Sequence, residues 1–216
     1  MLRLWRLYQK CMEVHPVKTQ VISSGILWGL GDIGAQAVTH STTLKNKQQN
    51  QLVEKEFKIN WQRVGITSMF GFAFVGPVGN FWYEYLDRFI RLQLKLQPKT
   101  AKFVAAKVAG DCFLFGPLNL VIFFSYIGFA SGKNVKQVKE DVKRDFLPSM
   151  VIAGGIWPLF QIANFRYVPV RYQLLYVNFL CLIDSCFLSW MEQQGDAAWK
   201  QWIKSFISLE NKKRIA

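Results

Sequence analysis

Three aspartates lie inside long apolar blocks of the sequence, at Asp32, Asp111 and Asp184. A charge at the centre of a bilayer costs roughly 3 kcal/mol on insertion scales, so such residues are expected to face the interior of a helix bundle. Two amides of another apolar block, Gln161 and Asn164, belong to the same group of candidates. Carboxylates and amides around a hydrated lumen favour the passage of cations. These five residues are therefore the candidate lining of a pore or polar lumen.

The same residues have a second interpretation. Intramembrane Asp, Asn and Gln side chains commonly hold neighbouring helices together by hydrogen bonds. Lys107 lies four residues before Asp111, a spacing at which the two charges can pair on one helix face. The residue pattern leaves both interpretations open. Three acids on separate helices favour a shared lumen only if those helices converge.

The sequence offers no candidate catalytic residue and no metal site. Its four cysteines include no CxxC spacing and are predicted to be small buried residues, and the chain has only two histidines. Gly29, Gly31 and Gly34 have the spacing of a nucleotide-binding loop, but they lie inside an apolar helix candidate rather than between a strand and a helix. We therefore expect neither an enzyme nor a bound cofactor.

Long apolar blocks must position these polar residues. The 216-residue chain is 51% hydrophobic and carries a formal net charge of +13. This hydrophobicity excludes a disordered chain, and apolar blocks joined by basic loops are typical of membrane proteins rather than nucleic-acid-binding proteins. A spanning helix requires about 20 apolar residues. The apolar blocks run over residues 17–38, 64–86, 103–130, 150–165 and 172–191.

The sequence thus predicts an all-α polytopic membrane helix bundle with four or five spanning helices. The shortest block, 150–165, is expected to span poorly or to lie partly re-entrant. Positive charges are divided too evenly between the two sets of loops to fix the orientation. One membrane domain is expected, with an amphipathic helix over 1–15, a helix bundle over 17–191 and a basic amphipathic tail over 192–216.

Three prolines lie inside apolar blocks, at Pro77, Pro117 and Pro158. Proline lacks an amide proton and clashes with the preceding turn of a helix, so each of them is expected to kink its helix.

The basic amphipathic segments predict contact with the membrane surface. Residues 1–15, 133–146 and the tail place apolar side chains opposite Lys and Arg, a pattern of helices that lie at anionic headgroups. Membrane lipids are therefore the expected partners, together with small solutes or ions. Association into a homo-oligomer stays open, and no direct nucleic-acid partner is expected.

A set of aromatic and polar motifs extends over residues 2 to 191. In the C-terminal half they are Trp157-Pro-Leu-Phe-Gln161-Ile-Ala-Asn164-Phe165-Arg-Tyr-Val-Pro169, Arg171-Tyr172, Leu175-Tyr176-Val-Asn178 and Leu188-Ser-Trp190. In the N-terminal half they are Leu4-Trp5, Tyr8, His15-Pro16, Gly29-Leu-Gly31-Asp32, Gly76-Pro77, Trp82-Tyr83 and Asp87-Arg88. This combination resembles the Mpv-seventeen / peroxisomal membrane protein family of small organellar membrane proteins.

The resemblance implies an integral protein of the mitochondrial inner membrane, with the peroxisomal membrane as the alternative. It also implies a weakly selective channel for small solutes or ions, with a role in organelle metabolite balance, reactive oxygen species and mitochondrial DNA upkeep. A non-conducting scaffold or assembly protein is the alternative function, because the basic amphipathic helices also suit lipid and protein partners.

Overall fold

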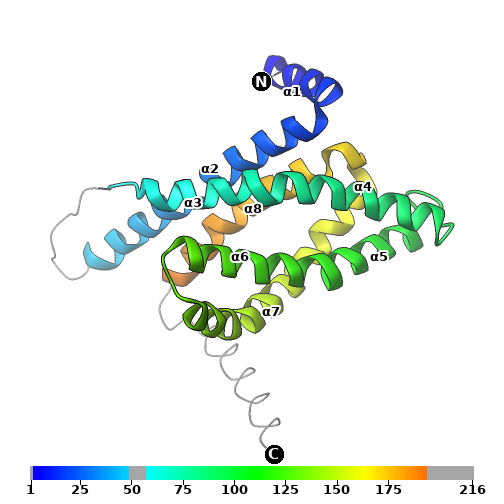
Figure 1. Cartoon of the computed structure of the whole chain (residues 1–216). Coiled ribbons are helices and arrows are strands. Elements are labelled where there is room, and N and C mark those ends of the chain that lie inside the picture. The colour runs from blue at the N-terminus through cyan, green and yellow to red at the C-terminus, as the bar shows by residue number, and fades with distance from the viewer. Residues whose placement is uncertain (1, 49–56, 194–216) are drawn as a thin grey trace, which may run out of the picture.

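The structure is a computed structural model that describes residues 2–48 and 57–193 (Figure 1). Within these residues all regular elements are helical. The α-helices are α1 (Leu2–Val14), α2 (Pro16–Gln48), α3 (Trp61–Phe70), α4 (Gly76–Leu92), α5 (Ala101–Gly110), α6 (Gly116–Ala130), α7 (Val135–Tyr167) and α8 (Val170–Gln193), and two π-helical turns are η1 (Gly71–Val75) and η2 (Asp111–Phe115). The predicted tail over 192–216 lies outside the described residues from residue 194 onward.

Several of these helices are long and apolar enough to cross a membrane. The three clear cases are Pro16–Ser41, Trp61–Leu92 and Ala101–Ala130, and α7 adds a fourth if its two bent halves form one span. The block over 172–191 forms most of α8. The predicted all-α membrane bundle is confirmed, and the part of the chain that the structure describes holds three or four candidate spans beside the four or five predicted.

Burial follows the pattern of a membrane protein, with polar groups inside and apolar groups outside. The side chains of Asn164 and Asn178 are completely buried, whereas Phe113 is 78% exposed and Leu159 is 68% exposed. Exposed apolar side chains on this scale mark a surface that faces lipid or a protein partner rather than water. The lipid-facing surface and the polar interior are therefore separated by the helices themselves.

Helices α2 and α8 lie side by side and run in the same direction (Figure 1). Gln20 near the start of α2 donates a hydrogen bond to the carbonyl of Arg171, and Trp28 further along α2 donates one to Asn178. The chain passes back and forth between them through α3–η1–α4, α5–η2–α6 and α7 (Figure 1). α1 packs at the end of the bundle where α8 begins, with its Trp5 ring 5.4 Å from the ring of Tyr172.

Glycines bring α2 into close contact with the second pass of the chain, the segment α3–η1–α4 (Trp61–Leu92). A Cβ atom on Gly76 would lie 2.5 Å from Cα of Val21, and one on Gly71 would lie 2.7 Å from the carbonyl oxygen of Ser24. Both neighbours are backbone atoms, which cannot move aside without moving the helix. Small residues at such positions let two membrane helices approach more closely than larger side chains allow.

Two of the three intramembrane prolines follow a π-helical turn. Pro77 comes directly after η1 and Gly76, and Pro117 comes directly after η2 and Gly116. The amide of Gly116 donates to the carbonyl of Asp111 five residues earlier, which closes a turn with one extra residue. The wider turn gives room where a proline ring would otherwise clash. Trp61–Leu92 and Ala101–Ala130 therefore each continue as a single candidate span.

Helix α7 joins two segments that the sequence analysis separates. The surface segment over 133–146 and the apolar block over 150–165 form one helix, which starts with a capping box in which Asn134 and Gln137 cap each other. Its parts Val135–Val151 and Gly154–Tyr167 meet at an angle of 60°. The bend lies one turn before Pro158, and in a straight helix the ring of a proline would clash with the carbonyl four residues earlier. The proline bend lets one helix follow the surface and then enter the bundle.

Candidate functional site

A chain of buried polar side chains begins at Asp111, the first residue of η2. Its carboxylate accepts hydrogen bonds from the indole of Trp82, at 3.0 Å, and from the amide of Gln161. The Gln161 amide also donates to the hydroxyl of Tyr83. Asn164 donates to the side-chain oxygen of Gln161 at 2.8 Å. The structure therefore brings three predicted lumen residues, Asp111, Gln161 and Asn164, into direct contact.

The same chain continues to a buried ion pair. Asn164 also donates to the backbone carbonyl of Gln173, and the side-chain oxygen of Gln173 accepts from Nζ of Lys107. Lys107 is completely buried and lies 3.0 Å from the carboxylate of Asp87. It does not pair with Asp111, although the two are four residues apart. Lys107 binds Asp87 on the neighbouring helix α4 instead, and Asp111, at the start of the wider π turn, binds Trp82 and Gln161.

Asp32 occupies a separate polar site. It is only 5% exposed and forms an ion pair with Arg63, at 2.7 Å, and accepts a hydrogen bond from Gln36. A cavity of about 660 Å³ lies beside this pair. Its polar lining comes from α2, α3 and α8 and from the residues just before α3 and just after α6, and it includes Asn60, Thr67, Ser131 and Ser185. Arg63 is 56% exposed, so the cavity presents both signs of charge.

Asp184 joins neither group. Its side chain is half-buried on α8, and no hydrogen bond or ion pair links it to another of the side chains that the structure describes. The structure thus divides the five predicted lumen residues among three places: the buried polar chain, the Asp32 cavity and the Asp184 position.

A cluster of aromatic rings separates the Asp32 cavity from the buried polar chain. Trp28 and Phe123 line the cavity, and both pack against Phe70, with ring centroids 5.1 Å and 5.3 Å from it. Phe70 belongs to the same packed cluster as Tyr83, whose hydroxyl accepts the bond from Gln161. A path from the cavity to the polar chain therefore meets this cluster first.

Several members of the polar chain are not among the site residues predicted from the sequence. Asp87 entered the sequence predictions only in the motif Asp87-Arg88, but it is buried and binds both Lys107 and Arg91. Gln173 and Trp82 were not selected as site residues. The available signal was that Lys107, Trp82 and Gln173 are polar groups within or next to apolar blocks, the same criterion that selected Asp111.

The candidate site acts through charges and hydrogen bonds, and the arrangements that would hold a metal ion or a nucleotide can be compared with the structure in turn. The described residues contain no group of three or more His, Cys, Asp or Glu side chains that could hold a metal ion. The four cysteines are free thiols, and Cys11 is exposed although the sequence analysis predicts buried cysteines. Gly29, Gly31 and Gly34 lie inside α2, in agreement with the rejection of a nucleotide-binding loop.

These features define an integral membrane protein, in which helices with apolar outer faces surround a buried polar interior. Comparison with known proteins gives the family. The model of the Mpv17 / PMP22 family matches residues 128–189. The mitochondrial inner membrane protein Mpv17 of Xenopus laevis is 35% identical over 188 residues, which are 87% of this chain and 96% of the relative.

Two further relatives cover the chain to a similar extent. The mitochondrial inner membrane protein Mpv17 of Homo sapiens is 35% identical over 190 residues, 87% of this chain and 96% of the relative. The PXMP2/4 family protein 2 of Dictyostelium discoideum is 30% identical over 189 residues, 88% of this chain and 91% of the relative. No solved structure matches the chain.

The chain belongs to the Mpv17 / PMP22 family. The family resemblance drawn from the sequence motifs is confirmed. The predicted location in the mitochondrial inner membrane agrees with the names of the Xenopus and human relatives.

Proposed function

We propose that this protein is a weakly selective channel for small solutes or ions in the mitochondrial inner membrane. We further propose that the described conformation is the closed one. The observation that carries the proposal is the order of three regions along the bundle: the polar cavity at Asp32, the aromatic cluster around Phe70 and the buried polar chain from Asp111 to Asp87. Hydrophobic constrictions between polar regions are a known way of gating a pore.

Weak selectivity follows from the charges of the cavity. Asp32 and Arg63 form an ion pair beside it, so their charges nearly cancel for an ion that passes at some distance. In the polar chain, Asp87 is balanced by Lys107 and Arg91. A pathway lined by such pairs gives neither cations nor anions a large advantage. The proposal assigns the protein no catalytic role.

The test is electrical recording from the purified chain in a planar bilayer. A salt gradient across the bilayer gives the reversal potential, and single-channel current gives the conductance. We expect discrete openings separated by long closures, with a reversal potential between zero and the value for an ideally selective channel. Protein that is folded and inserted but carries no current under any applied voltage would contradict the proposal.

The alternative is a non-conducting scaffold in the same membrane. It is favoured by the complete burial and mutual bonding of Gln161 and Asn164, an arrangement that holds helices together without any lumen. Gentle detergent extraction distinguishes the two functions, because a scaffold would be recovered with a stoichiometric partner protein. A channel formed by one chain would be recovered without such a partner and would still conduct.

A further inference from the structure

A long apolar groove runs between α5 and α7, away from the Asp32 cavity and the polar chain. Its volume is about 1250 Å³. One wall is a stripe of α7 in which the lining residues are four apart and so lie on one helix face. These residues are Met150, Gly154, Pro158, Ile162 and Arg166.

The opposite wall is built of small residues. Ala101, Ala105 and Ala109 are spaced one turn apart on α5 and line the groove. Across from them, a Cβ atom on Gly154 would meet no atom within 4 Å. The two helices therefore leave a hollow here that side chains of the described residues do not fill.

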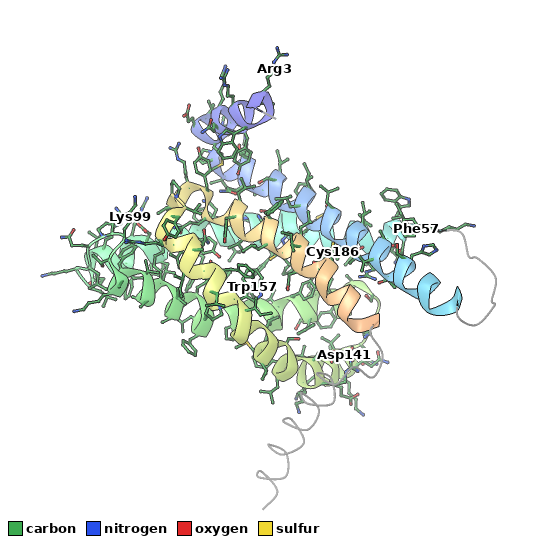
Figure 2. All side chains as sticks on the ribbon, turned by 180° about the vertical axis from the view of Figure 1, so that it is seen from behind. Arg3, Phe57, Lys99, Asp141, Trp157 and Cys186 are labelled. Carbon is green, nitrogen blue, oxygen red and sulfur yellow. The ribbon has the colours of Figure 1, made fainter. Side chains whose placement is uncertain are left out.

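The groove carries positive charge at one end only. Lys99 lies just before α5 and Arg166 lies near the end of α7, and they share one end of the groove because the two helices run in opposite directions. Both residues line the groove and are exposed. Neither forms an ion pair with an acid whose side chain the structure describes. Figure 2 shows Lys99 at one end of the bundle, whereas Trp157, next to the groove residue Pro158, lies nearer the middle. The other end of the groove, at Phe113, is apolar.

The length of the groove fits one leaflet of a membrane. Twelve residues separate Ala101 from Phe113, which corresponds to about 18 Å along a helix. One half of the hydrocarbon core measures about 15 Å. An acyl chain in this groove would thus begin at the two cations and end close to the bilayer centre.

We propose that the groove binds one anionic phospholipid, with an acyl chain between α5 and α7 and its phosphate at Lys99 and Arg166. Charge complementarity selects this occupant over a second copy of the chain. Every copy carries a net charge of +13, so a second copy would bring more positive charge toward two unpaired cations. The lipid site does not depend on whether the protein conducts.

Native mass spectrometry of the purified full chain tests the site. The chain in detergent is titrated with phosphatidylglycerol or with phosphatidylcholine of the same acyl chains. The Lys99→Ala/Arg166→Ala variant removes the cations of the groove, and Lys102→Ala/Arg3→Ala removes two exposed cations outside it. Gly154→Leu fills the groove, whereas Gly155→Leu adds the same side chain on the same helix at a position that does not line the groove and is equally free of neighbours.

We expect the wild-type chain to bind one phosphatidylglycerol in preference to phosphatidylcholine. Loss of both groove cations should weaken phosphatidylglycerol binding by about thirtyfold, because each cation near an anionic headgroup contributes roughly a factor of five. Gly154→Leu should abolish binding of the one tight lipid, and both control variants should retain it. Circular dichroism and thermal melting show that each variant is folded.

Two outcomes would overturn the proposal. Equal binding of the two lipids, unchanged by the loss of Lys99 and Arg166, would mean that the groove recognises no headgroup. A dimer that dissociates in Gly154→Leu while lipid binding persists would assign the groove to a second copy of the chain.

Discussion

The ammonium Nζ of Lys107 lies 3.0 Å from a carboxylate oxygen of Asp87, and water reaches none of the Lys107 side chain. Asp87 also binds Arg91, at 2.7 Å, at the edge of the bundle. The rings of Phe165 and Phe103 lie near the same ammonium group, at 4.7 Å and 5.6 Å. A charge pair therefore connects α4 and α5, and water cannot replace Asp87 as the partner of the buried Lys107 ammonium group.

The two members of this pair should differ in their effect on stability. Asp87→Asn leaves Lys107 buried without a counter-charge and should lower the free energy of unfolding by about 3 to 5 kcal/mol. Lys107→Met should cost less, because Asp87 keeps its contact with Arg91. Unfolding of the variants in detergent micelles measures both effects. Glu84→Gln is the control, because its 3.9 Å contact with exposed Arg88 should contribute at most about 1 kcal/mol.

The glycine contacts between α2 and the second pass predict another difference in stability. Gly76→Ala and Gly71→Ala each place a methyl group against backbone atoms and should destabilise the bundle by about 1 to 3 kcal/mol. Gly65→Ala on the same pass meets nothing within 4 Å and should stabilise it by up to about 1 kcal/mol through helix propensity. Thermal melting in detergent gives the order. Equal melting temperatures of Gly65→Ala and Gly76→Ala would argue against the close helix contact.

The aromatic cluster predicts a gating phenotype. Phe70 packs against Trp28, Phe123 and Tyr126 between the cavity and the polar chain, so Phe70→Ala should open the path. We expect a higher open probability in bilayer recordings, together with a loss of about 3 to 5 kcal/mol in stability from the cavity that is created.

Phe179→Ala is the control for the loss of an aromatic ring, because this side chain is 55% exposed. It should leave both stability and open probability nearly unchanged. The same open probability in Phe70→Ala and wild type would show that the cluster is packing alone.

The three aspartates should separate into two classes when each is changed to asparagine. Asp32 lines the cavity, and a unit charge about 6 Å from an ion in water-like surroundings changes the ion's energy by about 0.7 kcal/mol, or about threefold in occupancy. Asp32→Asn should therefore shift the reversal potential toward anions, and Arg63→Gln should shift it toward cations. Salt-gradient recordings measure both shifts.

Asp111→Asn should act on stability instead. The Gln161 amide already donates to Asp111, so the new amide group of the variant would place a second donor opposite it. The free energy of unfolding should fall by about 1 to 3 kcal/mol. The reversal potential should stay the same in this variant and in Asp184→Asn. A shift with Asp111→Asn as large as that with Asp32→Asn would restore the single lumen that the sequence predicts.

Local chemistry made much of the fold predictable. Apolar runs of membrane length, basic connecting segments and the cap residues Asn60, Thr100 and Asn134 are all readable along the chain, and the helices begin after those caps. The family motifs were equally visible, because they are continuous stretches of sequence. The merging of 133–146 with 150–165 into one helix was missed, because Pro148 lies between the two segments and a proline is typical of a helix boundary.

The site was less predictable than the fold. A single sequence shows that Asp32, Asp111 and Asp184 are costly in a membrane and must find partners, but not which partners they find. Asp111 and Lys107 pair well on paper at a spacing of four residues, yet each binds groups on other helices.

The sequence by itself determined that this chain forms a bundle of membrane helices with polar groups turned inward, because hydrophobicity and the cost of buried charge act on each segment separately. Only the tertiary structure decided that Asp111, Gln161 and Asn164 share one buried chain while Asp32 faces a cavity behind Phe70. The physical reason is that hydrogen bonds and ion pairs act over about 3 Å. Which groups come within that distance depends on how glycines, π turns and prolines set the helices against one another.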